Sequence, residues 1–229
     1  MLNSLKIYTP IAGTVFLARI LLDVSPVQAV SPAQQAILQW PVVLGAILLG
    51  FPAMHVAQKF GVPSEVNILT SARESLLAFA LGFGSAILLI VLDIVFVFPA
   101  DMNVLGLESV PFYLVGAFLV EVIQHLIPMA LWLGILGFLV FRNKRQKLLF
   151  WVGAFVISMI EPLSQLGGDF LVGYSLAFYF LSGLIFYGIN LSQMYFFRRG
   201  GFAPMLLYRI GLYSLWHWLW GAFRIGLLL

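Results

Sequence analysis

The feature that most constrains this chain is a series of apolar stretches, each about as long as a lipid bilayer is thick. They cover residues 8–24, 36–58, 75–98, 111–141, 148–163, 170–197 and 202–228. A transmembrane helix needs about 20 mostly apolar residues in a row. Only 9% of the residues are charged, so most of these helices lack the polar face that a helix in water requires. The sequence therefore predicts an all-α, polytopic membrane helix bundle of about seven transmembrane helices.

The composition also limits the domain count and the partners. The sequence contains no long linker and no low-complexity tract, which predicts a single transmembrane helical domain over residues 1–229. The basic residues are dispersed, without the basic domain that neutralises phosphates, so nucleic acid is not an expected partner. There is no cysteine, which excludes disulfides and thiolate chemistry. The expected surroundings are the lipid bilayer and, in one interpretation given below, other membrane protein subunits.

Loop charges predict the orientation. With seven spans, the basic residues outside the helices fall on one side of the membrane, at Lys6, Lys59, Arg73, Arg142, Lys144, Arg145, Lys147, Arg198 and Arg199. The opposite loops, 25–35, 99–110 and 164–169, contain no Lys or Arg and carry Asp101, Glu108 and Asp169 instead. Since basic loops stay in the cytoplasm, the N-terminus is predicted to be cytoplasmic. We expect a multi-pass protein of the plasma membrane or another energy-transducing membrane.

Two ionisable residues lie deep in the fourth span. Glu121 and His125 are four residues apart, so both project from one face of a helix. Charges at membrane depth are costly and are functional candidates by default. A carboxylate beside an imidazole can share a proton, activate water or supply two metal ligands. The alternative is a buried, hydrogen-bonded pair that joins helices. The pair could take zinc, but it lacks the second histidine of the common zinc motif and is not a specific metal signature, so metal and cofactor are left open.

Three more candidates lie in later spans. Counting from the cytoplasmic helix ends, His125 lies roughly 24 Å deep, Glu161 about 20 Å and His217 about 22 Å. Arg209 lies roughly 10 Å deep by the same count and is long enough to reach a carboxylate further in. We therefore expect these groups to converge in one layer of the bundle.

The layout resembles the CAAX-protease and bacteriocin-processing membrane peptidases, the CPBP or Abi family. The resemblance lies mainly in the order and spacing of elements over most of the chain. Its most similar segments are Leu92-Asp93 with Phe96-Val97-Phe98-Pro99, and Arg198-Arg199-Gly200-Gly201-Phe202-Ala203-Pro204 followed by Arg209, Tyr213 and Trp216-His217. The resemblance implies a helix bundle that hydrolyses peptide bonds within the membrane.

The family's motifs are altered in this chain. In the first, a pair of glutamates followed by an arginine, Glu121 matches the second glutamate, while Val120 and His125 replace the other two residues. In the second, a phenylalanine with a histidine four residues later, Ile157 and Glu161 occupy the two positions. The third, a histidine followed four residues later by asparagine or a similar residue, aligns either with Arg209 and Tyr213 or with His217 and Gly221.

Three functions follow as hypotheses. The first is a non-catalytic family member that acts as a subunit or scaffold of a membrane complex. The second is an active intramembrane peptidase, in which Glu121 activates water and His217 or Arg209 stabilises the oxyanion. The third is a small-solute transporter, although the sequence shows no internal repeat. A peptidase requires a water-accessible cavity that touches Glu121 and a histidine, whereas a scaffold packs these groups against each other without water.

Overall fold

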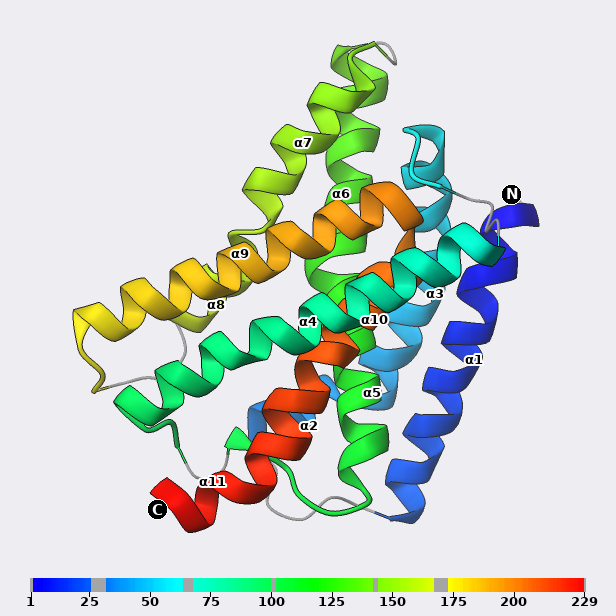
Figure 1. The fold of residues 1–229 in the computed structure, drawn as a ribbon. Coiled ribbons are helices and arrows are strands. Elements are labelled where there is room, and N and C mark those ends of the chain that lie inside the picture. The colour runs from blue at the N-terminus through cyan, green and yellow to red at the C-terminus, as the bar shows by residue number, and fades with distance from the viewer. Residues whose placement is uncertain are drawn as a thin grey trace.

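The computed structural model describes residues 2–25, 32–63, 68–99, 102–141, 144–166 and 173–228. Over these residues the secondary structure is helical (Figure 1). The elements are α1 (Leu2–Val24), α2 (Pro32–Ile37), α3 (Trp40–Lys59), α4 (Ile68–Phe96), α5 (Ser109–Val120), η2 (Glu121–Leu126), α6 (Ile127–Trp132), η3 (Leu133–Val140), α7 (Gln146–Ile157), α8 (Ile160–Leu166), α9 (Leu176–Gly200), α10 (Phe202–Tyr213), η5 (Ser214–Trp220) and α11 (Gly221–Leu228). The three η segments are π-helical turns.

Six helical stretches in the described residues are long and apolar enough to cross a membrane. They are Lys6–Val24, Trp40–Lys59, Ala72–Phe96, Ser109–Phe138, Gln146–Ser164 and Leu176–Gly200. These stretches support the expected class, an all-helical, multi-pass membrane protein. The seventh predicted span, 202–228, is helical in the pieces α10, η5 and α11 but is not among the six. It carries Arg209, His217 and Arg224, which lower its hydropathy. The count of seven and the cytoplasmic N-terminus stay predictions, and Asp101, Arg142 and Asp169 lie outside the described residues.

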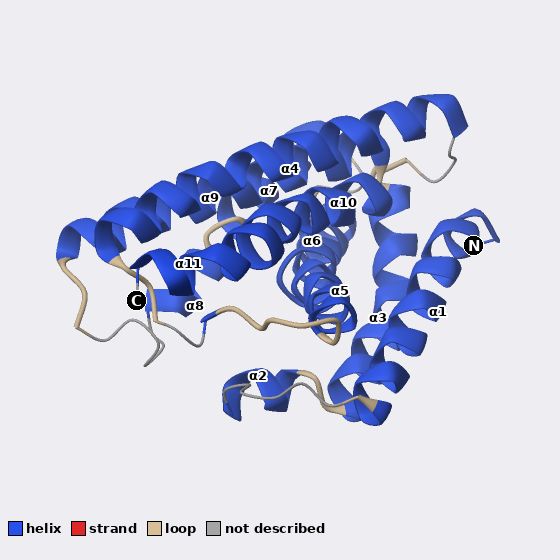
Figure 2. Ribbon diagram, turned by 60° about the horizontal axis from the view of Figure 1, so that its bottom comes forward, coloured by secondary structure: helices blue, strands red, loops and turns tan. Residues whose placement is uncertain are grey.

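The long helices run in two directions. In Figure 1, α1, α3 and the helix from α5 to α6 run roughly along the length of the molecule, while α4 and α9 cross them obliquely. Helices α4 and α9 contact each other and stay together in the turned view of Figure 2. Helix α10 contacts both of them and also α5 and α1, so it lies at the centre of the bundle. Side chains on α10 can therefore reach several spans at once.

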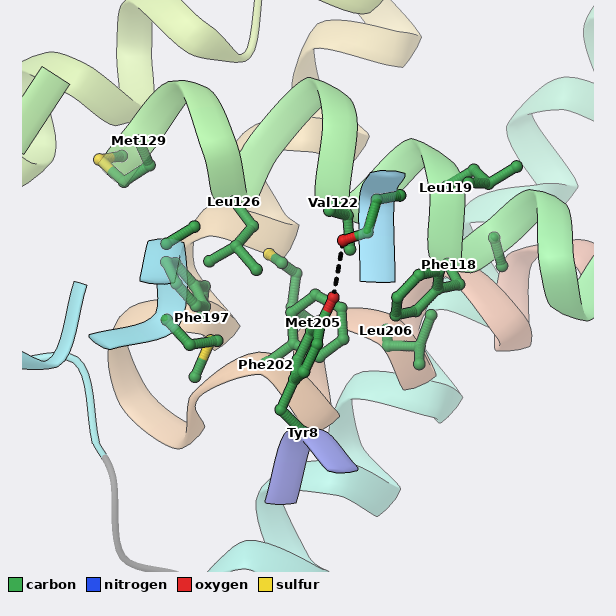
Figure 3. Packing of buried hydrophobic residues seen from close by; sticks show 14 of the residues in the cluster. Tyr8, Phe118, Leu119, Val122, Leu126, Met129, Phe197, Phe202, Met205 and Leu206 are labelled. Carbon is green, nitrogen blue, oxygen red and sulfur yellow. Dashed lines mark hydrogen bonds between the residues drawn. The ribbon is translucent and has the colours of Figure 1, made fainter. Parts of the chain in front are cut away.

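An aromatic cluster joins the first spans to this centre. Tyr8 on α1 is fully buried, and its hydroxyl donates a hydrogen bond of 3.1 Å to the carbonyl oxygen of Ala46 on α3 (Figure 3). Its ring lies 5.9 Å from that of Phe118 on α5 and 5.4 Å from that of Phe202 on α10, measured between centroids. One residue thus links four helices, and its hydroxyl keeps a partner despite burial.

Two glycines let α4 and α10 approach closely. A Cβ atom on Gly82 of α4 would lie 2.0 Å from the carbonyl oxygen of Tyr208, and one on Gly211 of α10 would lie 2.2 Å from that of Phe79. Any larger residue at either position would force the two backbones apart. Small residues are used in this way where helices associate in membranes.

The long fourth span stays helical across a proline. Pro128 in α6 has no N–H, so the carbonyl group of Gln124 loses its usual helical partner. The π-helical turn η2 lies directly before this position, and π-turns are a common way for a helix to absorb such a defect. Glu121 and His125 both lie in η2, so the same defect sets their position.

Candidate functional site

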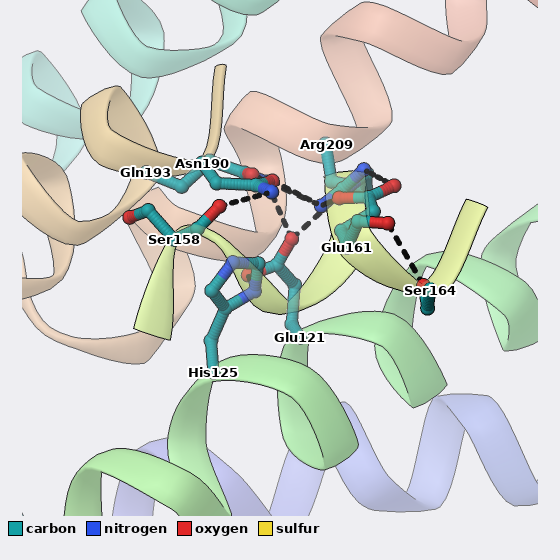
Figure 4. Close-up of polar contacts among 8 residues, drawn as sticks. All are labelled: Glu121, His125, Ser158, Glu161, Ser164, Asn190, Gln193 and Arg209. Carbon is teal, nitrogen blue, oxygen red and sulfur yellow. Dashed lines mark hydrogen bonds and ion pairs between the residues drawn. The ribbon is translucent and has the colours of Figure 1, made fainter. Parts of the chain in front are cut away.

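Arg209 forms the centre of a buried polar cluster. Its side chain is only 1% exposed, and its guanidinium group faces two carboxylates (Figure 4). Nε donates to Oε1 of Glu121 at 2.9 Å. Nη1 and Nη2 donate to the two oxygens of Glu161 at 3.0 and 2.9 Å, which is the bidentate arrangement that arginine and carboxylate groups favour.

Two amide side chains from α9 complete the contacts of the arginine. Nη2 of Arg209 also donates to Oδ1 of Asn190 at 3.1 Å and to Oε1 of Gln193 at 3.0 Å. Gln193 in turn donates a short hydrogen bond from Nε2 to Oε1 of Glu121. Asn190 donates from Nδ2 to the carbonyl oxygen of Ser158 at 3.3 Å. The cluster therefore holds η2, α8, α9 and α10 to one another. We call the six residues Glu121, His125, Glu161, Asn190, Gln193 and Arg209 the charge network.

The start of helix α8 sets the position of Glu161. The helix of the fifth predicted span is interrupted at Ser158–Met159, and α8 begins at Ile160. Glu161 therefore lies in the first turn of α8, where the helix dipole favours a negative charge. Pro162 is tolerated at this position because the first turn has no intrahelical partner for its missing N–H. Glu161 consequently faces Arg209 across the bundle.

His125 completes the charge network without a good hydrogen bond. Its Nδ1 lies 3.1 Å from Oε2 of Glu121, which is an ion-pair distance. Nevertheless, Nδ1 and Nε2 of His125 and Oε2 of Glu121 have no hydrogen-bond partner among the described residues. His125 therefore joins the network through its position beside Glu121.

Burial makes the network costly to disturb. Glu121 is fully buried, and Glu161 is 7% exposed. Removal of one member of a buried ion pair typically costs about 3–5 kcal/mol, because the other charge is left without compensation. Chemically, Arg209 and its four acceptor side chains satisfy one another, whereas the ring of His125 and Oε2 of Glu121 do not take part in these hydrogen bonds.

A cavity of about 190 Å³ lies against one side of the network. It is lined by Gln34, Leu89, Met102, Glu161, Phe186, Arg209, Leu212, Tyr213, Trp216 and His217. Glu161 and Arg209 therefore contribute to its wall. Glu121 and His125 do not line it.

His217 lies apart from the other four predicted site residues. Its Nδ1 is 2.8 Å from Oδ1 of Asn103, and its ring is stacked on Tyr113 with centroids 4.2 Å apart. It follows Arg209 by eight residues on one continuous helix, so the two are separated by roughly 12 Å along the helix axis. The structure thus brings Glu121, His125, Glu161 and Arg209 together and places His217 across the cavity.

Sequence reasoning missed Asn190 and Gln193. They are three residues apart on a largely apolar helix, so they share one face. That spacing is a usable signal, since polar residues on one face of a transmembrane helix turn toward the bundle interior. A neutral amide gives a weaker signal than a charge, however, and the partners of these two residues come from distant segments.

A second buried ion pair was also missed. Arg224 on α11 donates from Nε and Nη2 to the two oxygens of Asp93 at 2.7 and 2.8 Å. The same guanidinium donates to the carbonyl oxygens of Phe98 and Pro99, and the indole N–H of Trp220 donates to Asp93. All these contacts join the end of α4 to the C-terminal helix. They involve none of the residues that line the cavity beside Arg209, so they indicate a structural role for this ion pair.

No metal site is evident in the part of the chain that the structure describes, where three or more His, Asp or Glu side chains are nowhere grouped to hold an ion. Comparison with known proteins finds no matching family model, no significantly similar curated sequence and no significantly similar solved structure. The geometry of the network and of the cavity is therefore what bears on function.

Proposed function

We propose that this chain is a non-catalytic, multi-pass membrane protein that acts as a structural subunit of a membrane complex. In this proposal, the residues at the positions of the peptidase motifs hold the bundle together. The resemblance to CPBP or Abi peptidases then reflects the layout of the helices, while the chemistry of the site has been replaced by the charge network.

The observation that carries the proposal is that Glu121 is isolated from the cavity. A general base must lie within hydrogen-bond reach of the water molecule whose proton it takes. Glu121 is fully buried, and it does not line the cavity. Its Oε1 already accepts hydrogen bonds from Arg209 and Gln193. These contacts favour a structural role for the carboxylate.

The donors that an oxyanion would need are also in use. An oxyanion hole requires preorganised N–H groups that point at the reacting oxygen. Nε, Nη1 and Nη2 of Arg209 all donate to members of the network. His217, the other candidate, is held by Asn103 on another part of the cavity wall. The proposed peptidase roles are therefore not assembled around one reacting atom.

Small residues on outward-facing helix surfaces support the role as a subunit. Gly84 on α4 and Gly188 on α9 are exposed, and a Cβ atom on either would meet open space. Each has a small residue four positions away, Ala80 and Ser192 respectively. Because small residues at this spacing let membrane helices approach one another, these faces suit contact with another membrane protein.

The mass of the particle in native lipid tests the subunit role. We expect the chain, extracted with its surrounding lipid, to occur in a protein assembly heavier than its own 25.5 kDa. Gly188→Leu should reduce that mass, because it fills the space used for close approach. Gly13→Leu is the matched control, since Gly13 on α1 is also exposed beside open space. A parent chain that occurs only as a monomer would overturn the proposed role.

The non-catalytic part can be tested without knowing a substrate. Protein N-termini would be compared in cells that carry the parent chain and in cells that carry Glu121→Gln at equal abundance. We expect the two sets to be the same. Termini that disappear only with Glu121→Gln would instead establish the peptidase alternative.

A further inference from the structure

The cavity beside the network differs from the rest of the bundle in its lining. Glu161, Arg209 and His217 contribute ionisable groups to its wall, and Gln34, Tyr213 and Trp216 contribute further groups that can form hydrogen bonds. The rings of Phe186, Tyr213 and Trp216 are aromatic, and the rest of the wall is apolar. A concave, mainly apolar site with a few converging polar groups is the usual form of a small-molecule site.

The orientation of His217 is fixed by its neighbours. Its ring stacks on Tyr113 at 4.2 Å and meets Tyr213 edge to face at 4.8 Å, measured between centroids. Asn103 presents its Oδ1 to Nδ1 of the histidine, so Nδ1 carries the proton in this arrangement. Nε2 is then left as a hydrogen-bond acceptor. Such support by a second residue is typical of a histidine that holds a ligand in a defined orientation.

The two charged groups of the cavity, Arg209 and Glu161, also favour a donor in the ligand. Arg209 directs its N–H groups at Glu121, Glu161 and the amides of α9, so little of its donor capacity remains for an anion. Each oxygen of Glu161 accepts one bond from Arg209 and retains a lone pair. The cavity thus offers acceptors, one of them a carboxylate, and its aromatic wall is suited to a cation.

The volume limits the size of the ligand. A cavity of about 150 Å³ is known to accept benzene, and this one measures about 190 Å³. From the acceptors, the carboxylate and the volume together, we propose that the cavity binds a small organic cation, a protonated amine attached to a group the size of a single ring. This binding site goes beyond the structural role proposed above and does not depend on it.

Three probes of nearly equal size separate the possible chemistries. Binding of benzylammonium, benzyl alcohol and benzoate to the full chain in lipid nanodiscs would be measured by equilibrium dialysis. We expect saturable binding of benzylammonium at one site per chain. Benzyl alcohol should bind at least about tenfold more weakly, because it lacks the charge that strengthens a hydrogen bond to a carboxylate. Benzoate should not bind.

Variants then locate the site. His217→Phe keeps the aromatic stacking but removes the acceptor, and we expect it to weaken benzylammonium binding by about tenfold or more. Met102→Trp should block the cavity, since Met102 is one of its lining residues. Leu48→Trp is the control, because Leu48 on α3 is 66% exposed and lies outside the cavity; it should bind like the parent chain.

Several results would overturn the proposal. The chemistry is wrong if benzoate binds as tightly as benzylammonium, or if benzylammonium shows no saturable binding. The location is wrong if Met102→Trp binds like the parent chain while it unfolds at the same temperature. An equal loss of binding in Leu48→Trp would show general disruption in place of a blocked site.

Discussion

At the scale of single residues, Arg209 shows how a membrane interior accepts a charge. Its guanidinium contacts two carboxylates and two amide oxygens, and the side chain is 1% exposed. Each contact replaces water that the bilayer cannot supply. The pair Arg19–Asp23 on α1 is different, because Asp23 is 49% exposed and its carboxylate can be solvated without Arg19.

This contrast gives a prediction about stability. Arg209→Met should lower the free energy of unfolding by about 3–5 kcal/mol, because it leaves Glu121 and Glu161 buried without a counter-charge. Arg19→Met, the comparison, should cost clearly less, because it leaves behind only the half-exposed carboxylate of Asp23, which water can solvate. Reversible unfolding in lipid bicelles would measure both variants. Equal effects from the two substitutions would contradict the structural role of the network.

Part of the residue-scale picture could be predicted from the sequence. The four-residue spacing of Glu121 and His125 correctly places them on one face, and the length of Arg209 allows it to reach a carboxylate. The position of His217 could not be predicted, because depth along a helix leaves its rotation open. Its direction is set by Asn103 and Tyr113, which come from a distant segment.

At the scale of elements, the apolar stretches identify the long helices but not their interruptions. The predicted span 148–163 contains α7 and α8, with a turn at Ser158–Met159. The predicted span 75–98 lies mostly in α4, which begins earlier, at Ile68, and ends at Phe96. The π-turns of η2 and η5 also could not be predicted, because hydropathy does not distinguish them from α-helix. These interruptions nevertheless set the positions of Glu121, Glu161 and His217.

The crossing of α4 and α10 gives a prediction at this scale. Gly82→Ala should destabilise the protein by about 1–3 kcal/mol, because the added methyl group overlaps the carbonyl group of Tyr208 and forces the helices apart. Gly84→Ala is the matched control on the same helix, where the methyl group meets open space. It should be neutral or stabilise the helix by about 0.5–1 kcal/mol. Unfolding of the two variants under identical conditions would test the crossing, and an equal response would argue against it.

At the scale of the whole molecule, the predicted orientation can be tested directly. The sequence has no cysteine, so a single introduced thiol reports its own location. With the N-terminus in the cytoplasm, Leu107→Cys should react with an impermeant thiol reagent on intact cells, since Leu107 is 90% exposed in the loop before α5. Lys144→Cys should react only after the membrane is opened. The reverse pattern would invert the predicted topology.

The central claim is that the charged residues hold the bundle together by neutralising one another. Its most direct test is the free energy of unfolding of Arg209→Met compared with that of the triple variant Glu121→Met, Glu161→Met and Arg209→Met, both measured in lipid. Since replacement of a whole buried ion group by apolar residues is often neutral, we predict that the triple variant recovers most of the roughly 3–5 kcal/mol lost in the single variant. A triple variant that is no more stable than Arg209→Met alone would contradict the claim.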